Sequence, residues 1–171
     1  MTRRSLLMLA GGLAALGAAY VLHRRSDEHQ LRAASEDVAR ALGFDATRES
    51  SAARRARIER EFSRSIEPGV VVRVPDLPEL GRGREKLLEK VIDTGGFDGI
   101  DVALSDASIS VDESGSTATL RARAKLSAAG ATRRFDDMRS LRVSWVRRDG
   151  GWRITSIEVG AATHEHPEAR P

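Results

Sequence analysis

Histidine and tyrosine, two side chains that often transfer protons in active sites, are scarce in this chain of 171 residues. The four histidines, His23, His29, His164 and His166, lie near its two ends, and the single tyrosine, Tyr20, lies within an apolar stretch. There is no cysteine, which excludes disulfides, thiolate metal sites and cysteine nucleophiles. Catalysis in the central part of the chain would therefore have to use carboxylates, arginine, lysine, serine or threonine.

One pair of charged residues has a spacing that would place both side chains together in a functional site. Asp137 and Arg139 share their parity with Leu141, Val143 and Trp145 in a predicted strand, so all five side chains point to one face. A guanidinium close to a carboxylate holds that carboxylate ionised. The functional interpretation is a pair that orients a ligand, or a general base. The alternative, which we favour, is a structural ion pair at the rim of the fold.

Three other polar features could contact acidic partners or metal ions. The sequence RRARIER at 54–60 mixes arginine with glutamate and lacks aromatic neighbours, which favours a solvated helix over a surface for lipid or nucleic acid. Arg121, Arg123 and Lys125 alternate with apolar residues and form either a candidate interaction face or an ordinary exposed face of a sheet. The sequence HEH at 164–166 supplies too few ligands for a metal ion, and we expect neither a metal nor a cofactor.

The formal net charge of +3 arises from the start of the chain. Of the 28 lysines and arginines, four lie in residues 1–25, which hold none of the 25 acidic residues, so the remainder has 24 basic and 25 acidic side chains. General affinity for nucleic acid needs many unopposed cations that face phosphates. We therefore expect no nucleic-acid partner.

Residues 6–22 carry no charge and lie between two pairs of arginines, which predicts a membrane-spanning or export segment. The opening TRRSLLM resembles a twin-arginine export signal, and the small residues up to Ala19 offer a cleavage site. Arg24 and Arg25 oppose translocation of the following flank. We favour an uncleaved single-pass anchor in the cytoplasmic membrane with the domain on the outer side, and the alternative is export with cleavage near Ala19.

Residues 1–25 are thus an anchor or signal, residues 26–160 a domain, and residues 161–171 a tail that we expect to be disordered. Helical spacing of apolar residues predicts helices from Ser26 to Gly43 and from about Thr47 to Ser65. Pro68-Gly69 is expected to end the second helix, a short strand follows at 70–74, and a third helix is expected to end at Gly95-Gly96.

From Asp98 onward the apolar period changes to two, which predicts four sequential strands. A slip of parity near Ser105–Asp106 predicts a bulge, and a second slip occurs between Ile154 and Ile157. The sequences DESG and RRDGG predict the turns between strands. The predicted fold class is α+β, with a curved antiparallel sheet against three helices and one transmembrane or signal helix before them. The predicted strands lie at 100–111, 117–127, 132–147 and 152–159.

Two segments resemble the nuclear transport factor 2-like superfamily, also called SnoaL-like or cystatin-like. They are GRGREKLLEKV at 81–91 and LRVSWVRRDGGWRITSIEV at 141–159. The resemblance covers about residues 28–160 and implies a cone in which a strongly bent sheet wraps around three helices. The superfamily includes isomerases, cyclases, dehydratases, hydrolases and non-catalytic assembly modules, so the resemblance implies a fold and not a reaction.

The resemblance also implies where an active site would lie. Isomerase-like members use a tyrosine beside an aspartate base, and this chain has no tyrosine outside the apolar segment. Asp76 lies near the position of that aspartate, but its place between two prolines favours a turn-stabilising role. Asp106 beside the expected bulge is a weaker candidate. The candidate pocket residues are Asp76, Asp106, Asp137, Arg139 and Trp145.

Two functions remain open. The first, which we favour, is a non-catalytic, membrane-tethered interaction module of the cell envelope, in which the outer sheet face contacts a second copy or an envelope protein. The second is a small-molecule-binding or lyase/isomerase-type domain, in which Asp137 and Arg139 cap a hydrophobic pocket inside the cone.

Overall fold

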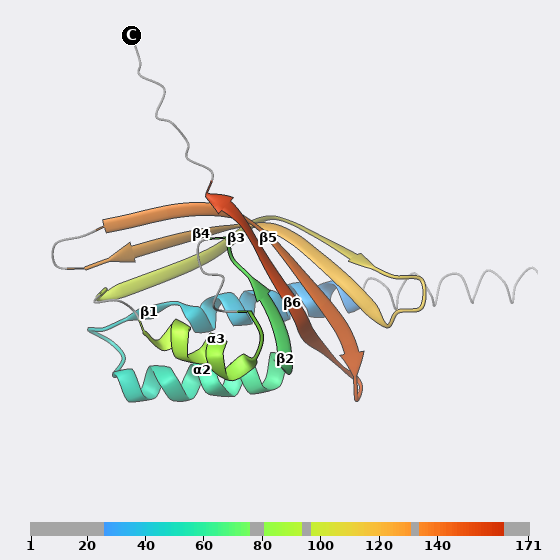
Figure 1. The fold of residues 1–171 in the computed structure, drawn as a ribbon, viewed down its shortest axis with the longest axis horizontal. Coiled ribbons are helices and arrows are strands. Elements are labelled where there is room, and N and C mark those ends of the chain that lie inside the picture. The colour runs from blue at the N-terminus through green and yellow to red at the C-terminus, as the bar shows by residue number, and fades with distance from the viewer. Residues whose placement is uncertain (1–25, 76–80, 94–96, 131–133, 163–171) are drawn as a thin grey trace, which may run out of the picture.

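The structure, a computed structural model, describes residues 26–75, 81–93, 97–130 and 134–162. Helices gather beneath one face of a curved six-stranded sheet (Figure 1). The first helix occupies residues 26–42, and the predicted α+β order of three helices followed by four sequential strands is confirmed. The other elements are β1 (Phe44–Asp45), α2 (Ser51–Ser65), β2 (Ile66–Arg73), α3 (Arg84–Ile92), β3 (Gly99–Val111), β4 (Thr117–Ala129), β5 (Arg134–Arg148) and β6 (Gly151–Ala162).

The predicted anchor at residues 6–22 lies outside the described residues. Among the helices within them, none has the length and apolar character needed to cross a bilayer. The expected tail from residue 161 also lies mostly outside, except that β6 continues through Ala162.

Helix α2 begins four residues later than predicted. Ser50 caps it, because its hydroxyl accepts a hydrogen bond of 3.2 Å from the backbone N–H of Ala53. Thr47 lies instead in a turn, where its backbone N–H and its hydroxyl both donate to the carboxylate of Asp45, at 2.9 and 2.7 Å. The local hydrogen bonds of the aspartate therefore delay the helix.

The end of α2 also differs from the prediction that Pro68-Gly69 stops it. The chain passes directly from Ser65 into β2, and Ile66 already has extended dihedral angles. Pro68 and Gly69 lie where the register of β2 against β6 is irregular, between Ile66 and Val71. A proline that cannot donate to a strand ladder is accommodated there.

The strands are ordered β1-β3-β4-β5-β6-β2. Neighbours from β1 to β6 are antiparallel, but β2 is parallel to β6, so the sheet is mixed and not wholly antiparallel as predicted. Parallel pairing needs a long connection. Here α3 and the three strands β3, β4 and β5 lie between β2 and β6 in the chain, which allows β2 to run in the same direction as the last strand.

The bulge predicted near Ser105–Asp106 is confirmed. Ser105 faces Arg123 across β4 and Ser108 faces Arg121, so three steps along β3 match two steps along β4. Asp106 has φ 52°, a positive value that is uncommon outside glycine. The extra residue restores the inward orientation of the apolar residues in the second half of β3.

The slip predicted in β6 is confirmed as well. Ile154 faces Trp145 and Ser156 faces the adjacent residue Ser144, so two steps along β6 match one step along β5. A further irregularity lies near the end of β6, at Gly160. A Cβ atom there would clash with the hydroxyl oxygen of Ser140, so the present position of that hydroxyl depends on the absence of a side chain at Gly160.

Both predicted turns are present. In the β5–β6 hairpin, Asp149 and Gly150 have φ 49° and 77°, as a tight hairpin turn requires. In the β3–β4 turn, the Asp112 carboxylate accepts hydrogen bonds from the Ser114 hydroxyl and from the backbone N–H groups of Ser116 and Thr117. The bond from Ser114, followed by those from the backbone, lowers the pKa of Asp112 to about 2.

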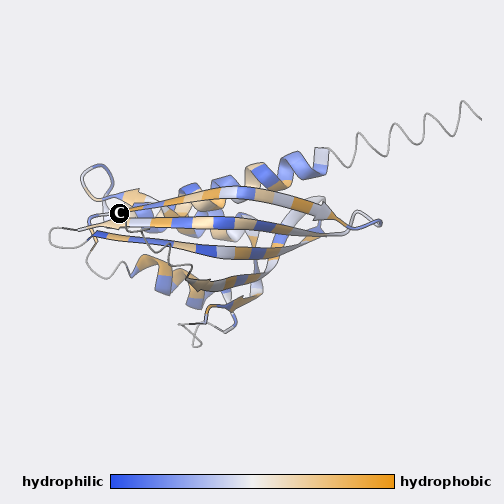
Figure 2. Cartoon of the chain, turned by 90° about the horizontal axis from the view of Figure 1, so that it is seen from above, coloured by the Kyte–Doolittle hydropathy of each residue, from blue (hydrophilic) through white to orange (hydrophobic). Residues whose placement is uncertain are grey.

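The core lies between the inner face of the sheet and the helices. Hydrophilic and hydrophobic residues alternate along the strands (Figure 2), which gives the sheet one face for the core and one for solvent. The largest fully buried apolar side chains are Leu31, Ile58, Phe62, Ile66, Val70, Leu120 and Trp145.

Candidate functional site

The interior of the cone contains a cavity of about 270 Å³ between the helices and the inner face of the sheet. The helices contribute Val38 and Phe62 to its wall, and the strands contribute Leu120 and Trp145. Ser35 supplies the one hydroxyl among the described lining residues, and this hydroxyl already donates to the backbone carbonyl of Leu31 at 2.7 Å. The cavity is therefore suited to an apolar molecule.

One end of the cavity is closed and the other reaches the surface. Leu120, Trp145 and Ile154, which are 1–2% exposed, close the first end. At the second end the lining residues Leu126 and Leu141 are half-buried.

The predicted pair Asp137 and Arg139 lies next to this open end. In the register of β4 and β5, Asp137 faces Leu126 and Arg139 faces Ala124, both of which line the cavity. The Arg139 Nε donates to Asp137 Oδ2 at 2.6 Å, and 21% and 12% of the two side chains are exposed. The structure thus brings these two residues together at the rim, as expected from their spacing.

Proton transfer has little support inside the cavity. None of the described residues that line it carries a titratable side chain. His29 is exposed on the first helix, and Asp137 is already bonded to a guanidinium. Within the part of the chain that the structure describes, no group of three His, Asp or Glu side chains is arranged to hold a metal ion. The cavity can bind and enclose a molecule, but its described walls offer no acid or base.

The other candidate pocket residues are dispersed. Trp145 is part of the closed wall. Asp106 is at the bulge on the outer side, 3.6 Å from the Arg123 guanidinium, and is therefore remote from the cavity lining. Asp76 lies outside the described residues.

The predicted interaction face is exposed on the outer side of the sheet. Arg121, Arg123 and Lys125 point away from the core at successive outward positions of β4. Arg121 faces Arg142 of β5, which extends the basic row onto the next strand. The charge is partly balanced, because Glu158 lies 4.0 Å from Arg142 and Asp106 lies near Arg123.

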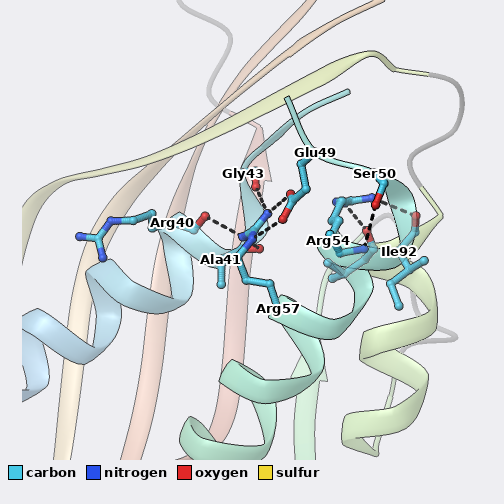
Figure 3. Close-up of polar contacts among 10 residues, drawn as sticks. Arg40, Ala41, Gly43, Glu49, Ser50, Arg54, Arg57 and Ile92 are labelled. Carbon is cyan, nitrogen blue, oxygen red and sulfur yellow. Dashed lines mark hydrogen bonds and ion pairs between the residues drawn. The ribbon is translucent and has the colours of Figure 1, made fainter. Parts of the chain in front are cut away.

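The RRARIER segment is only in part the solvated helix that its composition suggests. Arg55 and Arg60 are exposed, but Arg54 and Arg57 make contacts within the fold (Figure 3). Arg57 of α2 donates to the carbonyl oxygens of Ala41 and Gly43 at 2.7 and 2.9 Å, and to both carboxylate oxygens of Glu49. It thereby caps the C-terminus of the first helix. The hydrogen bond from Arg57 lowers the pKa of Glu49, and the same bond raises the pKa of Arg57.

Arg54 caps the third helix in the same manner. It is 6% exposed and donates to the carbonyl oxygens of Val91 and Ile92 at 2.8 and 3.1 Å (Figure 3). Its guanidinium also lies 4.1 Å from the centre of the Phe44 ring. Burial lowers the pKa of Arg54. Sequence alone gave no sign of this role, because both carbonyls come from residues 37 or 38 positions further along the chain.

A further ion pair, with a buried carboxylate, joins the start of the described chain to the last hairpin. Asp27, which is 2% exposed, accepts a hydrogen bond from Arg147 of β5. The Arg147 guanidinium lies 4.8 Å from the centre of the Trp152 ring. Asp27 lies at the start of the described part of the first helix, and its partner Arg147 is 120 positions further along the chain, so the pair could not be predicted from the sequence.

The comparison with family models matches the SnoaL-like domain over residues 52–158. This match spans more than half of the chain and includes the β5–β6 hairpin and α3. The chain belongs to the SnoaL-like domain family. The resemblance inferred from the sequence is therefore confirmed, and the SnoaL-like cone is the frame in which the cavity, the rim pair and the basic row lie.

Solved structures show the same fold at low sequence identity. Protein Kfla4162 from Kribbella flavida has 14% identity and a TM-score of 0.62, over 82% of this chain and 93% of its own. A proposed dehydratase of the NTF2-like family from Streptomyces avermitilis has 16% identity and a TM-score of 0.61, over 80% and 96%. A proposed scytalone dehydratase from Novosphingobium aromaticivorans has 17% identity and a TM-score of 0.54, over 88% and 96%. No curated protein matches the chain.

Proposed function

We propose that this SnoaL-like domain binds a small apolar molecule inside its cone without transforming it. The observation that carries the proposal is the cavity of about 270 Å³, whose described lining has one hydroxyl and no titratable group. Ligand pockets commonly begin at about 300 Å³, so the occupant is small, of the size of one or two rings. The similar structures include proposed dehydratases, which supports a ligand in the cone of this chain.

The rim pair has a defined part in this proposal. Asp137 and Arg139 form a half-buried ion pair at the open end, where a polar end of the ligand would meet water. The Arg139 guanidinium is the cationic member of this pair, so a polar or anionic end of the ligand would meet it at the rim. The pair orients the molecule, and the carboxylate is not proposed as a base.

The test uses the full chain in neutral detergent and the fluorescent probe 1-naphthylamine, whose two fused rings give it about the required size. Saturable binding of one probe per chain is expected. Ala124→Phe fills the cavity from the open end and should abolish this binding, whereas Ser110→Phe adds the same ring to an exposed position of β3 and should leave it unchanged. Equal binding by the two variants, or no saturable binding by the wild type, contradicts the proposal.

A second candidate is the membrane-tethered interaction module of the cell envelope, in which residues 6–22 form the anchor. The exposed row of Arg121, Arg123 and Lys125 supports it, because a basic row on a free sheet face complements an acidic surface. The variant Arg121→Glu/Lys125→Glu should lose partners that the wild type retains after cross-linking in membranes. A reporter fused after Pro171, active only outside the cytoplasm, tests the orientation of the anchor.

A further inference from the structure

Strand β3 has an edge that the described residues leave largely open. The strand comprises 13 residues, but β1 pairs only with Gly99 and Ile100. Further along, the bulge at Asp106 interrupts the edge, and Arg32 donates to the carbonyl oxygen of Ala107 at 3.3 Å. Between these two points, residues 101–105 have no strand partner on the side away from β4 among the described residues. Alternate residues of such a strand turn their N–H and C=O groups outward.

An open groove of about 1090 Å³ follows this edge and continues over the end of β4 and the start of β5. It lies between the end of the first helix, which supplies Ala39, and the first half of β3, which supplies Val102 and Leu104. Phe44 and Ile100 add apolar surface at the end where β1 pairs. The groove therefore has the two features of a site for strand addition, namely free backbone groups and apolar positions beside them.

The charge of the groove is negative, although the protein as a whole is formally positive. One of its two arginines, Arg40, is paired with Asp37 at 2.6 Å, and one of its five carboxylates, Asp45, is paired with Arg48 at 3.2 Å. Neither Asp37 nor Arg48 is among the lining residues. No ion pair among the described residues involves Glu36, Asp98 or Asp101. The groove is lined by the carboxylates of Glu36, Asp45, Asp98, Asp101 and Asp136 and by the guanidiniums of Arg40 and Arg134.

A second copy of the chain is a poor occupant. The other edge of the sheet, β2, is covered, because Val72 N–H donates to Gly81 and Gly83 N–H donates to Val70, both at 2.9 Å. Pairing of two β3 edges would bring Asp101 of each copy into the same acidic groove. The covered β2 edge and the acidic charge of the groove therefore favour a basic partner over a second copy of the chain.

We infer that the β3 edge groove binds an extended, basic peptide segment of another protein, which adds as a strand beside residues 101–105. Its Lys or Arg side chains alternate with small apolar side chains, because successive residues of a strand point to opposite faces. The apolar side chains face Val102 and Leu104, and the cationic ones face Asp101 and its acidic neighbours. This inference does not depend on a ligand in the cone.

The test uses the full chain in neutral detergent and three fluorescein-labelled peptides: KVKVTVKV, its acidic counterpart EVEVTVEV, and KVKVTVKV with methyl groups on alternate backbone nitrogens. Fluorescence anisotropy should show binding of the first peptide alone, since the second has the wrong charge and the third cannot complete a strand ladder. Asp101→Lys should weaken binding by about tenfold or more, whereas Glu113→Lys, in the exposed β3–β4 turn, should leave it unchanged.

Hydrogen exchange locates the bound peptide independently of charge. Protection of backbone amides in residues 101–105 on addition of KVKVTVKV is expected. Equal binding of the methylated peptide, unchanged affinity in Asp101→Lys, or protection confined to other strands would overturn the inference. Concentration-dependent dimers that compete with the peptide would instead show that the edge is occupied by a second copy, which also overturns it.

Discussion

Arg57 and Ala41 are separated by 16 residues, and the guanidinium of one donates to the carbonyl oxygen of the other at 2.7 Å. The same guanidinium reaches Gly43 and Glu49, so a single side chain of α2 holds the end of the first helix and the loop after it. That helix forms one wall of both the cone cavity and the edge groove.

Arg57→Met should lower the free energy of unfolding by about 3 kcal/mol, because it removes charge-assisted hydrogen bonds to two helix-end carbonyls and a carboxylate. Urea denaturation followed by circular dichroism measures the change. Arg60→Met, on an exposed face of the same helix, is the matched control and should change stability by less than about 0.5 kcal/mol. Equal effects of the two substitutions would show that the cap contributes nothing specific.

The carboxylate of Glu49 should make stability depend on acidity. Its pKa in the folded chain is lowered from the ordinary 4.5 by the hydrogen bond from Arg57, so its contribution is fully present above the unfolded value and is lost as pH falls through the folded one. Wild type should therefore exceed Glu49→Gln in stability at neutral pH, and the difference should shrink below about pH 4.5. Denaturation curves at several pH values measure this, and a difference that stays constant contradicts the assignment.

Gly160→Ala should destabilise the fold by about 1 kcal/mol, since the new Cβ would lie 2.1 Å from the Ser140 hydroxyl oxygen unless that side chain rotates. In a Ser140→Ala background the nearest atom is the Ser140 Cβ position, at 3.5 Å, which is an ordinary contact. The double variant should thus be more stable than the sum of the single effects predicts. Additive effects in the thermal denaturation of all four proteins would exclude this clash.

Arg147→Met should cost about 3 kcal/mol, because it removes the guanidinium that donates to the buried Asp27 and packs on Trp152. Asp27→Asn/Arg147→Met should recover part of this loss, since no buried charge then remains at either position. Chemical denaturation of the two variants gives the comparison. A double variant that is less stable than Arg147→Met alone would show that the carboxylate stabilises the fold by other contacts.

The strands after Asp98 could be predicted because the residues that define their bulge and their turn are neighbours in the sequence. The parity slip at Ser105–Asp106 marks a bulge by itself, and the Asp149–Gly150 pair marks a hairpin by itself. The parallel pairing of β2 with β6 has no such local mark, since it depends on which edge of the finished sheet is free.

Three arginines that donate to carbonyl oxygens at helix ends show why such contacts could not be predicted from the sequence. Arg54 and Arg57 each cap the C-terminus of a helix other than their own, and Arg153 of β6 donates to the carbonyl oxygen of Ser63 at 2.6 Å near the end of α2. All the acceptors are backbone carbonyls, which any sequence provides. In a chain so rich in arginine, a buried guanidinium and a solvated one have the same local sequence context. Of the candidate site, the spacing predicted the pair Asp137 and Arg139, while the cavity depended on how side chains fill the cone.

Ala39, Val102 and Leu104 line both the internal cavity and the edge groove, so one layer of side chains separates the two. A molecule on one side of this partition presses on the same atoms that a molecule on the other side contacts. Any effect of one molecule on the affinity of the other must be reciprocal, by the same factor in each direction. If both proposals hold, these three residues would connect the occupancy of the interior with that of the surface groove.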